Sequence, residues 1–277
     1  MKFSIVTISF NQAEYLERTI LSVINQNYPE IEYIIVDPGS TDNSQEIILK
    51  YSHVFSHIIF EPDQGPADGL NKGFKRATGD IFYFLNSDDI LLDNTLSKVA
   101  RFFNTHPEID VVSGHSTIIN EYERKIRNGY SDPFYLLGYA YGSIVQMQPS
   151  TFFRAESFRR TSGFNVENKI GWDAELFIEM HMRGAKFALK DEFFSGYRLH
   201  PQSITSSKSK KRDEEFRQHY KKMFRKIMGR DIQPFDLILK GFLLALKYAR
   251  DPRHLYERLL KGPIYGRRNK VRSLKGS

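Results

Sequence analysis

The stretch DIFYFLNSDD at residues 80–89 decides the fold. Its first part, Asp80–Leu85, is an apolar run that is typical of a strand. The strand ends in an amide and two adjacent carboxylates, those of Asn86, Asp88 and Asp89. In open sheets with parallel strands, ligands bind beyond the carboxyl ends of the strands. The stretch therefore predicts a strand and a site directly after it.

The residues before this stretch predict a β-α-β unit. Phe3–Ser9 alternates apolar and polar residues, as a strand does. Glu14–Gln26 places its apolar residues on one helical face, and Pro29 follows the end of that face. Ile31–Val36 is a run of β-forming residues, as expected of a strand that is buried on both faces.

The alternation continues along the chain. Further helices are predicted over residues 42–53, 67–77, 94–104 and 173–183, and further strands at residues 58–60, 111–112 and 148–153. Such alternation predicts an α/β fold with a central, mostly parallel sheet flanked by helices. We expect chemistry in the loops that follow Ile8, Val36, Phe60 and Leu85, because these loops leave the carboxyl ends of strands.

Charge divides the chain into two parts. Residues 1–207 hold 19 Lys/Arg and 26 Asp/Glu, a net charge of −7, whereas residues 208–277 hold 21 and 7, a net charge of +14. We therefore predict a catalytic domain at residues 1–206 and a basic helical tail at residues 207–277. A basic tail favours an anionic partner, either a membrane surface or nucleic acid.

The tail contains an apolar helix over Phe235–Arg250 that is too short and too charged to span a bilayer. It favours peripheral attachment to the inner face of the plasma membrane, with packing on the catalytic domain or on a second subunit as the alternative. The absence of cysteine excludes disulfides and thiolate metal sites. The N-terminus lacks the features of a signal peptide, so we expect a cytoplasmic location.

Two loops after predicted strands each carry a candidate ligand-binding carboxylate. Asp37 stands at the end of the second strand, where a carboxylate can accept hydrogen bonds from a nucleotide base, although the loop also reads as a well-made turn. Asp63 follows the third strand and has the same two interpretations, a ligand contact or a loop with a helix cap. The Asn86–Asp89 loop supplies hard oxygen ligands of the kind that hold Mg²⁺ or Mn²⁺, which would neutralise a diphosphate, with a capped loop as the alternative interpretation.

These segments together resemble the family 2 inverting glycosyltransferases with the GT-A fold. The resemblance covers about residues 3–205 and rests on four motifs in order: residues 6–11 (VTISFN), 36–42 (VDPGSTD), 61–65 (EPDQG) and 86–89 (NSDD). It implies transfer of a sugar from a nucleotide donor, with a UDP-sugar favoured, to a glycan or lipid-linked acceptor. Cell-surface polysaccharide assembly is the setting that the family implies.

The resemblance also assigns roles to residues. Thr7 and Asp37 would contact the base and Asp63 would lie near the nucleoside. Asp88 and Asp89 would supply the carboxylates of the D-x-D motif that binds Mn²⁺ or Mg²⁺. Asn86 occupies the first position of that motif, so it is a variant that would still face the donor.

Two later segments complete the assignment. Residues 171–176 (GWDAEL) resemble the segment with the family's catalytic base, which maps to Asp173, with an N-cap as the plainer reading and Glu175 as the second candidate. Trp172 stands where the family often has Glu and could stack on an acceptor sugar. Residues 196–205 resemble the family's Arg-x-His motif, in which His200 would join the metal site and Arg198 would offset diphosphate charge.

Two other functions compete with this one. A nucleotidyltransferase also uses carboxylates and Mg²⁺, but the chain has no Gly-rich phosphate loop followed by Lys. A nucleic-acid-binding protein would use the basic tail and would bind oligonucleotides in a salt-sensitive way. It would leave the Asn86–Asp89 loop and the acidic body without a purpose, so we rank nucleic acid below a sugar donor. An oligomer is compatible with the sequence.

Overall fold

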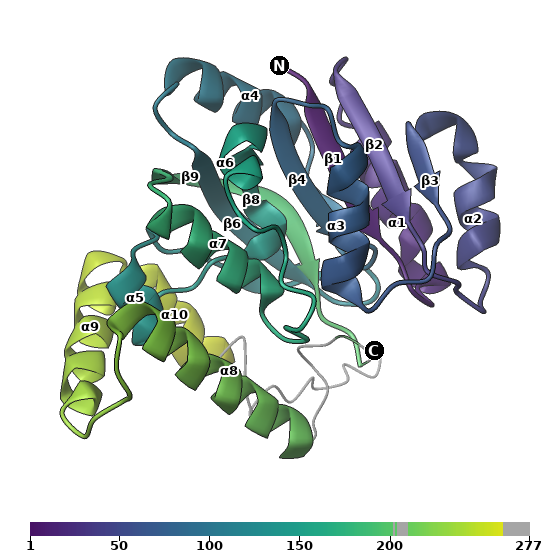
Figure 1. The fold of residues 1–277 in the computed structure, drawn as a ribbon. Coiled ribbons are helices and arrows are strands. Elements are labelled where there is room, and N and C mark those ends of the chain that lie inside the picture. The colour runs from purple at the N-terminus through teal and green to yellow at the C-terminus, as the bar shows by residue number, and fades with distance from the viewer. Residues whose placement is uncertain (202, 204–209, 263–277) are drawn as a thin grey trace, which may run out of the picture.

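A nine-stranded sheet organises the computed structural model, which describes residues 1–201, 203 and 210–262 (Figure 1). The strands are β1 (Phe3–Ile8), β2 (Ile31–Val36), β3 (His57–Ile59), β4 (Ile81–Asn86), β5 (Ile90–Leu91), β6 (Val111–Ile119), β7 (Lys125–Gly129), β8 (Thr151–Arg154) and β9 (Phe187–Arg198). Their order is β3-β2-β1-β4-β8-β6-β9-β5, and β7 pairs with β6.

Most of the strands run in one direction, as the sequence predicts. β1 pairs parallel with β2 and β4, β2 with β3, and β6 with β9. β8 lies antiparallel between β4 and β6 and so restores the common direction on its far side. The remaining two strands, β5 and β7, are antiparallel additions at the edge.

Helices cover both faces of the sheet (Figure 1). They are α1 (Ala13–Ile24), α2 (Ser44–Lys50), α3 (Pro66–Arg76), α4 (Thr95–Thr105), α5 (Leu136–Ala140), α6 (Ala155–Arg159), α7 (Trp172–Met182), α8 (Lys210–Met228), α9 (Asp236–Arg250) and α10 (Pro252–Lys261), with short 3₁₀ turns η1 (Ser52–Val54) and η2 (Gln148–Ser150). Apolar residues of α1 and α4 form one core cluster with the sheet. Residues of α3 and α7 form the other on the opposite face.

The sequence prediction missed the longest strand, β9. Three charged residues in its middle, Lys190, Asp191 and Glu192, interrupt the apolar pattern from which strands are recognised. The predicted strand at residues 148–153 is wrong at its start, because η2 occupies Gln148–Ser150 and β8 begins at Thr151. Its Pro149 cannot donate to a sheet ladder, which explains why pairing begins later.

The basic C-terminal segment forms three helices, of which α8 and α9 pack against α5, while α10 packs against α9 and β7. Tyr141, Phe224 and Leu243 bury a small apolar cluster between α5, α8 and α9. A polar anchor accompanies it, because the buried Asp236 carboxylate receives the Tyr141 hydroxyl at 2.6 Å and both terminal nitrogens of Arg230. The division at residues 206–207 lies outside the described residues and stays a prediction.

A buried carboxylate locks the amino ends of the first strands. Glu32 on β2 accepts hydrogen bonds from Lys2, Ser4 and the Thr78 backbone amide. Hydrogen bonding to the ionised form outweighs the opposing effect of burial and lowers the pKa of Glu32 to about 2. The carboxylate thus joins β1, β2 and the turn that precedes β4.

We predict that Glu32→Gln lowers the free energy of unfolding at pH 7 by about 1–3 kcal/mol, because charge-assisted bonds are lost in a buried place. The folded state favours the ionised carboxylate. Its contribution is therefore complete above the ordinary pKa of 4.5 and is lost as the pH falls toward about 2. Urea unfolding across this range should show the two proteins converging in acid. Glu30→Gln, at an exposed site, is the control, and equal losses in both variants contradict the assignment.

Candidate functional site

Strand register brings three loops to one edge of the sheet. Ile8 at the end of β1 lies opposite Val36 of β2 and Asn86 of β4. The loops that follow these residues therefore begin side by side. The sequence predicted this edge as the site of chemistry, and the parallel pairing confirms that the loops meet there.

Side-chain hydrogen bonds fasten the first two loops together. Asn11, in a left-handed conformation with φ 53°, donates its backbone amide to Ser40 Oγ and accepts the Thr41 amide at 2.8 Å. The Asp42 carboxylate accepts a hydrogen bond at 2.9 Å from the backbone amide of Ala13, the first residue of α1. The starts of α1 and α2 are thereby held in fixed relation at the edge of the sheet.

Two residues predicted to contact the nucleotide base are buried. Asp37 is fully buried, and both of its carboxylate oxygens accept hydrogen bonds from its own loop. The donors are the backbone amides of Gly39 and Ser40 and the Ser40 hydroxyl. Thr7 is fully buried on β1, and its hydroxyl lies 3.1 Å from the Tyr33 hydroxyl. In this structure both side chains therefore hold the loops above them, and the base contact predicted for each stays a prediction.

Asp63 remains at the edge and partly accessible. Its Oδ1 accepts the Gly65 amide at 2.8 Å, and burial raises the pKa of its carboxyl group. The first turn of α3 approaches it closely, because a Cβ on Gly69 would stand 2.8 Å from Asp63 Oδ2. Glycine at position 69 thus leaves room for the carboxylate beside the ends of β1 and β2.

The third loop presents Asp88 to His200. Asp88 Oδ2 lies 3.0 Å from His200 Nε2, although the two residues are 112 positions apart in sequence. The His200 ring packs 4.5 Å from the Tyr15 ring of α1. Asn86, at the end of β4, donates to Gln148 Oε1 at 3.3 Å. Sequence reasoning missed Tyr15 and Gln148, because no motif marks them and only tertiary packing brings them to the site.

Asp89 points into the protein and away from this pair. It is 1% exposed, and its Oδ1 accepts the Arg198 backbone amide at 2.8 Å. Burial, together with the neighbouring Asp88, raises the pKa of Asp89 well above the ordinary range. The other oxygen, Oδ2, is buried and has no hydrogen-bond partner among the described residues, so the metal-binding role of Asp89 stays a prediction.

Arg198 is also a supporting residue. Its fully buried guanidinium donates to the Asp88 carbonyl at 2.6 Å and to the Asn120 and Glu121 carbonyls, and it pairs with the Glu123 carboxylate at 2.9 Å. These partners engage all three nitrogens and the side chain is buried, so the contacts seen hold the loop, and the contact with a diphosphate stays a prediction. Arg198 thereby joins β9 to the backbone of the Asp88 loop.

The donors at this loop suit a hard divalent cation in part. Asp88 and His200 offer a carboxylate and an imidazole side by side, and Mn²⁺ accepts both ligand types. Among residues 1–201, 203 and 210–262, no group of three or more His, Asp or Glu lies at metal-binding separation. Mg²⁺ and Mn²⁺ sites commonly take further ligands from water and substrate phosphates, so the pair fits such an ion. A pocket of about 260 Å³ opens beside His200, lined also by Glu14, Tyr15, Glu121, Tyr122 and Pro201.

Asp173 lies in the first turn of α7. The N-cap of this helix is Gly171, in a left-handed conformation with φ 71°, so Asp173 is not the N-cap. Burial raises the pKa of its carboxyl group. Glu175 differs, because Asn165, Asn168 and Lys226 surround its carboxylate and its pKa is lowered. Glu175 is thus a structural anion, and Asp173 is the better candidate for a base.

The C-terminal helix α8 supports the start of α7. His219 of α8 packs against Gly171, where a Cβ would stand 2.9 Å from His219 Nε2. Lys226 of the same helix reaches Glu175 at 3.5 Å. The predicted tail therefore contacts the segment that carries Asp173, which the sequence did not indicate. Figure 1 shows α8 running alongside α7.

Comparison with known proteins identifies relatives of this chain. The family model described as Glycosyl transferase family 2 matches residues 4–162. An uncharacterized glycosyltransferase of Nostoc sp. is 36% identical over 130 residues, which are 44% of this chain and 40% of the relative. The poly-beta-1,6-N-acetyl-D-glucosamine synthase of Staphylococcus epidermidis is 32% identical over 120 residues, 43% of this chain and 29% of the relative.

The fold has solved counterparts. Staphylococcus aureus TarS 1–349 in complex with UDP-GlcNAc superposes with a TM-score of 0.65 at 21% sequence identity, covering 95% of this chain and 77% of that one. At this identity the likeness concerns the fold alone. The chain spans less than half the length of the two curated relatives.

We predict that Arg198→Met lowers the free energy of unfolding by at least about 2 kcal/mol, because three carbonyls and a carboxylate lose their buried donor. Chemical denaturation measures the loss. Arg124→Met, at an exposed arginine of the same region, is the control and should change stability little. Unchanged stability together with weaker UDP binding would show that Arg198 serves the diphosphate after all.

Proposed function

The chain belongs to glycosyl transferase family 2, and on this premise we propose that it transfers a sugar from a nucleotide diphosphate donor to an acceptor hydroxyl. A UDP-sugar is the favoured donor, which the complex of TarS with UDP-GlcNAc supports. A glycan or lipid-linked acceptor in cell-surface polysaccharide biosynthesis is supported by the named activity of the Staphylococcus epidermidis relative. A nucleic-acid-binding function is not favoured.

The main support for the proposal is the contact between Asp88 and His200 at the carboxyl end of β4. It places a carboxylate and an imidazole at the edge where ligands of such sheets bind. Asp63 lies at the same edge beside the ends of β1 and β2. We assign the donor nucleotide to the space above these strands and its diphosphate to the side of Asp88.

We assign a divalent cation, Mn²⁺ or Mg²⁺, to Asp88 and His200. When bound, such an ion supplies positive charge that stabilises a departing nucleoside diphosphate. Arg198 and one oxygen of Asp89 hold the backbone around the loop through the contacts described above, which orients Asp88.

We assign the base to Asp173. In an inverting transfer, one carboxylate takes the proton of the acceptor hydroxyl as that oxygen attacks the anomeric carbon opposite the leaving diphosphate. A raised pKa makes the carboxylate a stronger base than an ordinary aspartate. The proposed single displacement needs no covalent intermediate with the enzyme.

The proposed function also includes a cellular location. A lipid-linked acceptor is presented at a membrane, and the basic C-terminal helices favour attachment to the inner face of the plasma membrane from the cytoplasm. Among the described residues, no helix is both long and apolar enough to cross a bilayer. Attachment would therefore be peripheral through the described part of the chain.

We predict that UDP raises the melting temperature of the wild type in the presence of Mn²⁺ and that Asp88→Asn removes this increase, because the variant loses the anionic ligand of the ion. Thermal-shift measurements with UDP, GDP, dTDP and CDP, each with and without Mn²⁺, identify the base. Asp93→Asn, at an exposed aspartate after β5, should respond as the wild type does. No response of the wild type to any nucleotide would remove the main support for the donor site.

We predict that Asp173→Asn slows UDP release from UDP-GlcNAc by about 10²–10⁴-fold while the UDP-dependent thermal shift is kept, because only the base is lost. The wild-type rate should fall on the acid side with an apparent pKa above the ordinary 3.8 of aspartate, since the carboxylate must be ionised to act. Glu156→Gln, at an exposed site on α6, is the control. Full activity of Asp173→Asn would rule out this base.

A further inference from the structure

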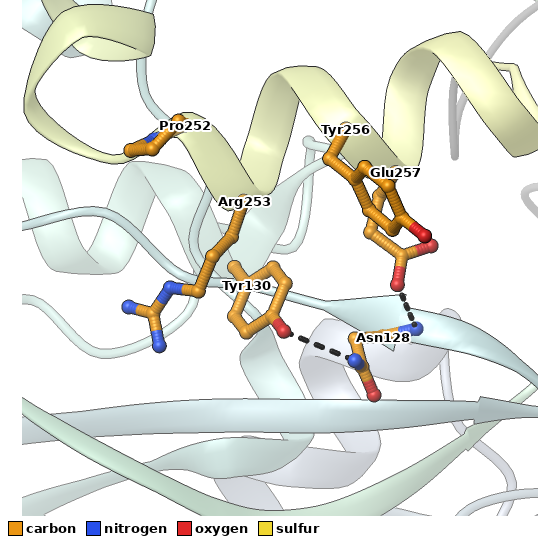
Figure 2. Close-up of a pocket in the computed structure, with 6 residues that line it drawn as sticks. All are labelled: Asn128, Tyr130, Pro252, Arg253, Tyr256 and Glu257. Atoms are coloured by element: carbon orange, nitrogen blue, oxygen red, sulfur yellow. Dashed lines mark hydrogen bonds between the residues drawn. The ribbon is translucent and has the colours of Figure 1, made fainter.

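Polar contacts attach the last two helices to the rest of the protein. Lys247 of α9 reaches the buried Asp132 carboxylate at 2.7 Å, and His254 of α10 lies 3.1 Å from the same carboxylate. Figure 2 shows α10 above β7, with Glu257 accepting the Asn128 backbone amide. These polar contacts fix the rotation of both helices about their axes.

Both helices also carry exposed apolar side chains. On α9 these recur at the spacing of one helical face, and on α10 they include Leu259 and Leu260. We define the docking face as Phe235, Ile238, Phe242, Leu259 and Leu260, each more than half exposed. Figure 1 shows α9 and α10 on the outside of the molecule, remote from β1, β2 and β3. Exposed apolar groups in this number mark an interaction surface.

The charges around the docking face are unbalanced. Residues 235–262 hold six Lys/Arg and three Asp/Glu, a net charge of +3. All three acids are paired within the protein: Asp236 with Arg230, Asp251 with Arg253, and Glu257 with Arg127. Arg250 and Lys261 are exposed and have no ion pair with an acid among the described residues. The sequence that follows, residues 263–277, adds five Lys/Arg and no acid.

We propose that the docking face lies on an anionic lipid bilayer. Its apolar side chains would enter the boundary between headgroups and acyl chains, while the surrounding bases would meet lipid phosphates. A second copy of the chain would bring the same unpaired bases to the contact, so like charges would oppose that association. The idea rests on the proposed function only in that a lipid-linked acceptor gives the attachment a purpose.

Attachment here would also orient the catalytic edge. The helix α8 connects the docking helices to α7, because its Phe224 packs in the cluster with Leu243 and its Lys226 pairs with Glu175. The Asp173 end of α7 would therefore be held at a fixed position relative to the membrane surface. Such a position suits an acceptor that is itself anchored in lipid.

Flotation of the full chain with vesicles tests the proposal. The vesicles are phosphatidylcholine alone or an equal mixture of phosphatidylcholine and phosphatidylglycerol. We expect the wild type to float with the anionic vesicles, and less so as salt is raised. Ile238→Glu combined with Leu259→Glu should lower the bound fraction by at least about tenfold. Arg250→Glu combined with Lys261→Glu should weaken binding to the anionic vesicles only.

Leu49→Glu is the matched control, since Leu49 is similarly exposed but lies on α2 at the far side of the sheet. All variants should keep the thermal response to UDP and Mn²⁺. A loss of this response would show a defect in the donor site, which is distinct from a loss of membrane binding. Absence of flotation by the wild type, or equal loss in Leu49→Glu, overturns the proposal. So does a wild-type dimer in light scattering that the Ile238→Glu and Leu259→Glu pair makes monomeric, or tight oligonucleotide binding that the Arg250→Glu and Lys261→Glu pair abolishes.

Discussion

The in-register parallel pairing of β1 with β2 and β4 is the constraint on which the rest of the molecule depends. It sets Ile8 level with Val36 and Asn86, so three loops leave the sheet at one edge. Parallel strands need crossover helices, and these cover both faces of the sheet and bury the strands. The burial of Glu32 at the opposite end fixes the strand starts, so the register is held from both ends.

A second level of order comes from polar groups that are buried below the site. Asp37, Asp89 and Arg198 are each at most 1% exposed and are bonded mainly to backbone groups of the loops. They resemble ligand-binding residues in sequence because they are charged and lie in the site motifs. In the structure they hold the loops, whereas Asp63 and Asp88 keep part of their surface exposed and the buried His200 side chain contacts Asp88. Charge in a motif therefore does not distinguish a binding residue from one that supports it.

The C-terminal helices contact the rest of the protein and also carry exposed apolar residues. One face of α8 and α9 is buried against α5, and α8 also braces the start of α7 through His219 and Lys226. The other face of α9 and α10 stays exposed and apolar, with unpaired bases around it. Packing, one of the two interpretations of the tail that the sequence allowed, accounts for the buried face, and we propose membrane attachment for the exposed one.

The sequence by itself determined the α/β class, the early strands and helices to within a few residues, and the edge of the sheet that carries the motifs. It could do so because hydrophobic periodicity and turn residues act over short distances along the chain. It did not reveal β9, whose centre is charged, or the burial of Thr7, Asp37 and Arg198. Only the tertiary structure placed His200 beside Asp88 and His219 beside Gly171, because contacts between distant segments depend on how the whole chain packs and not on local pattern.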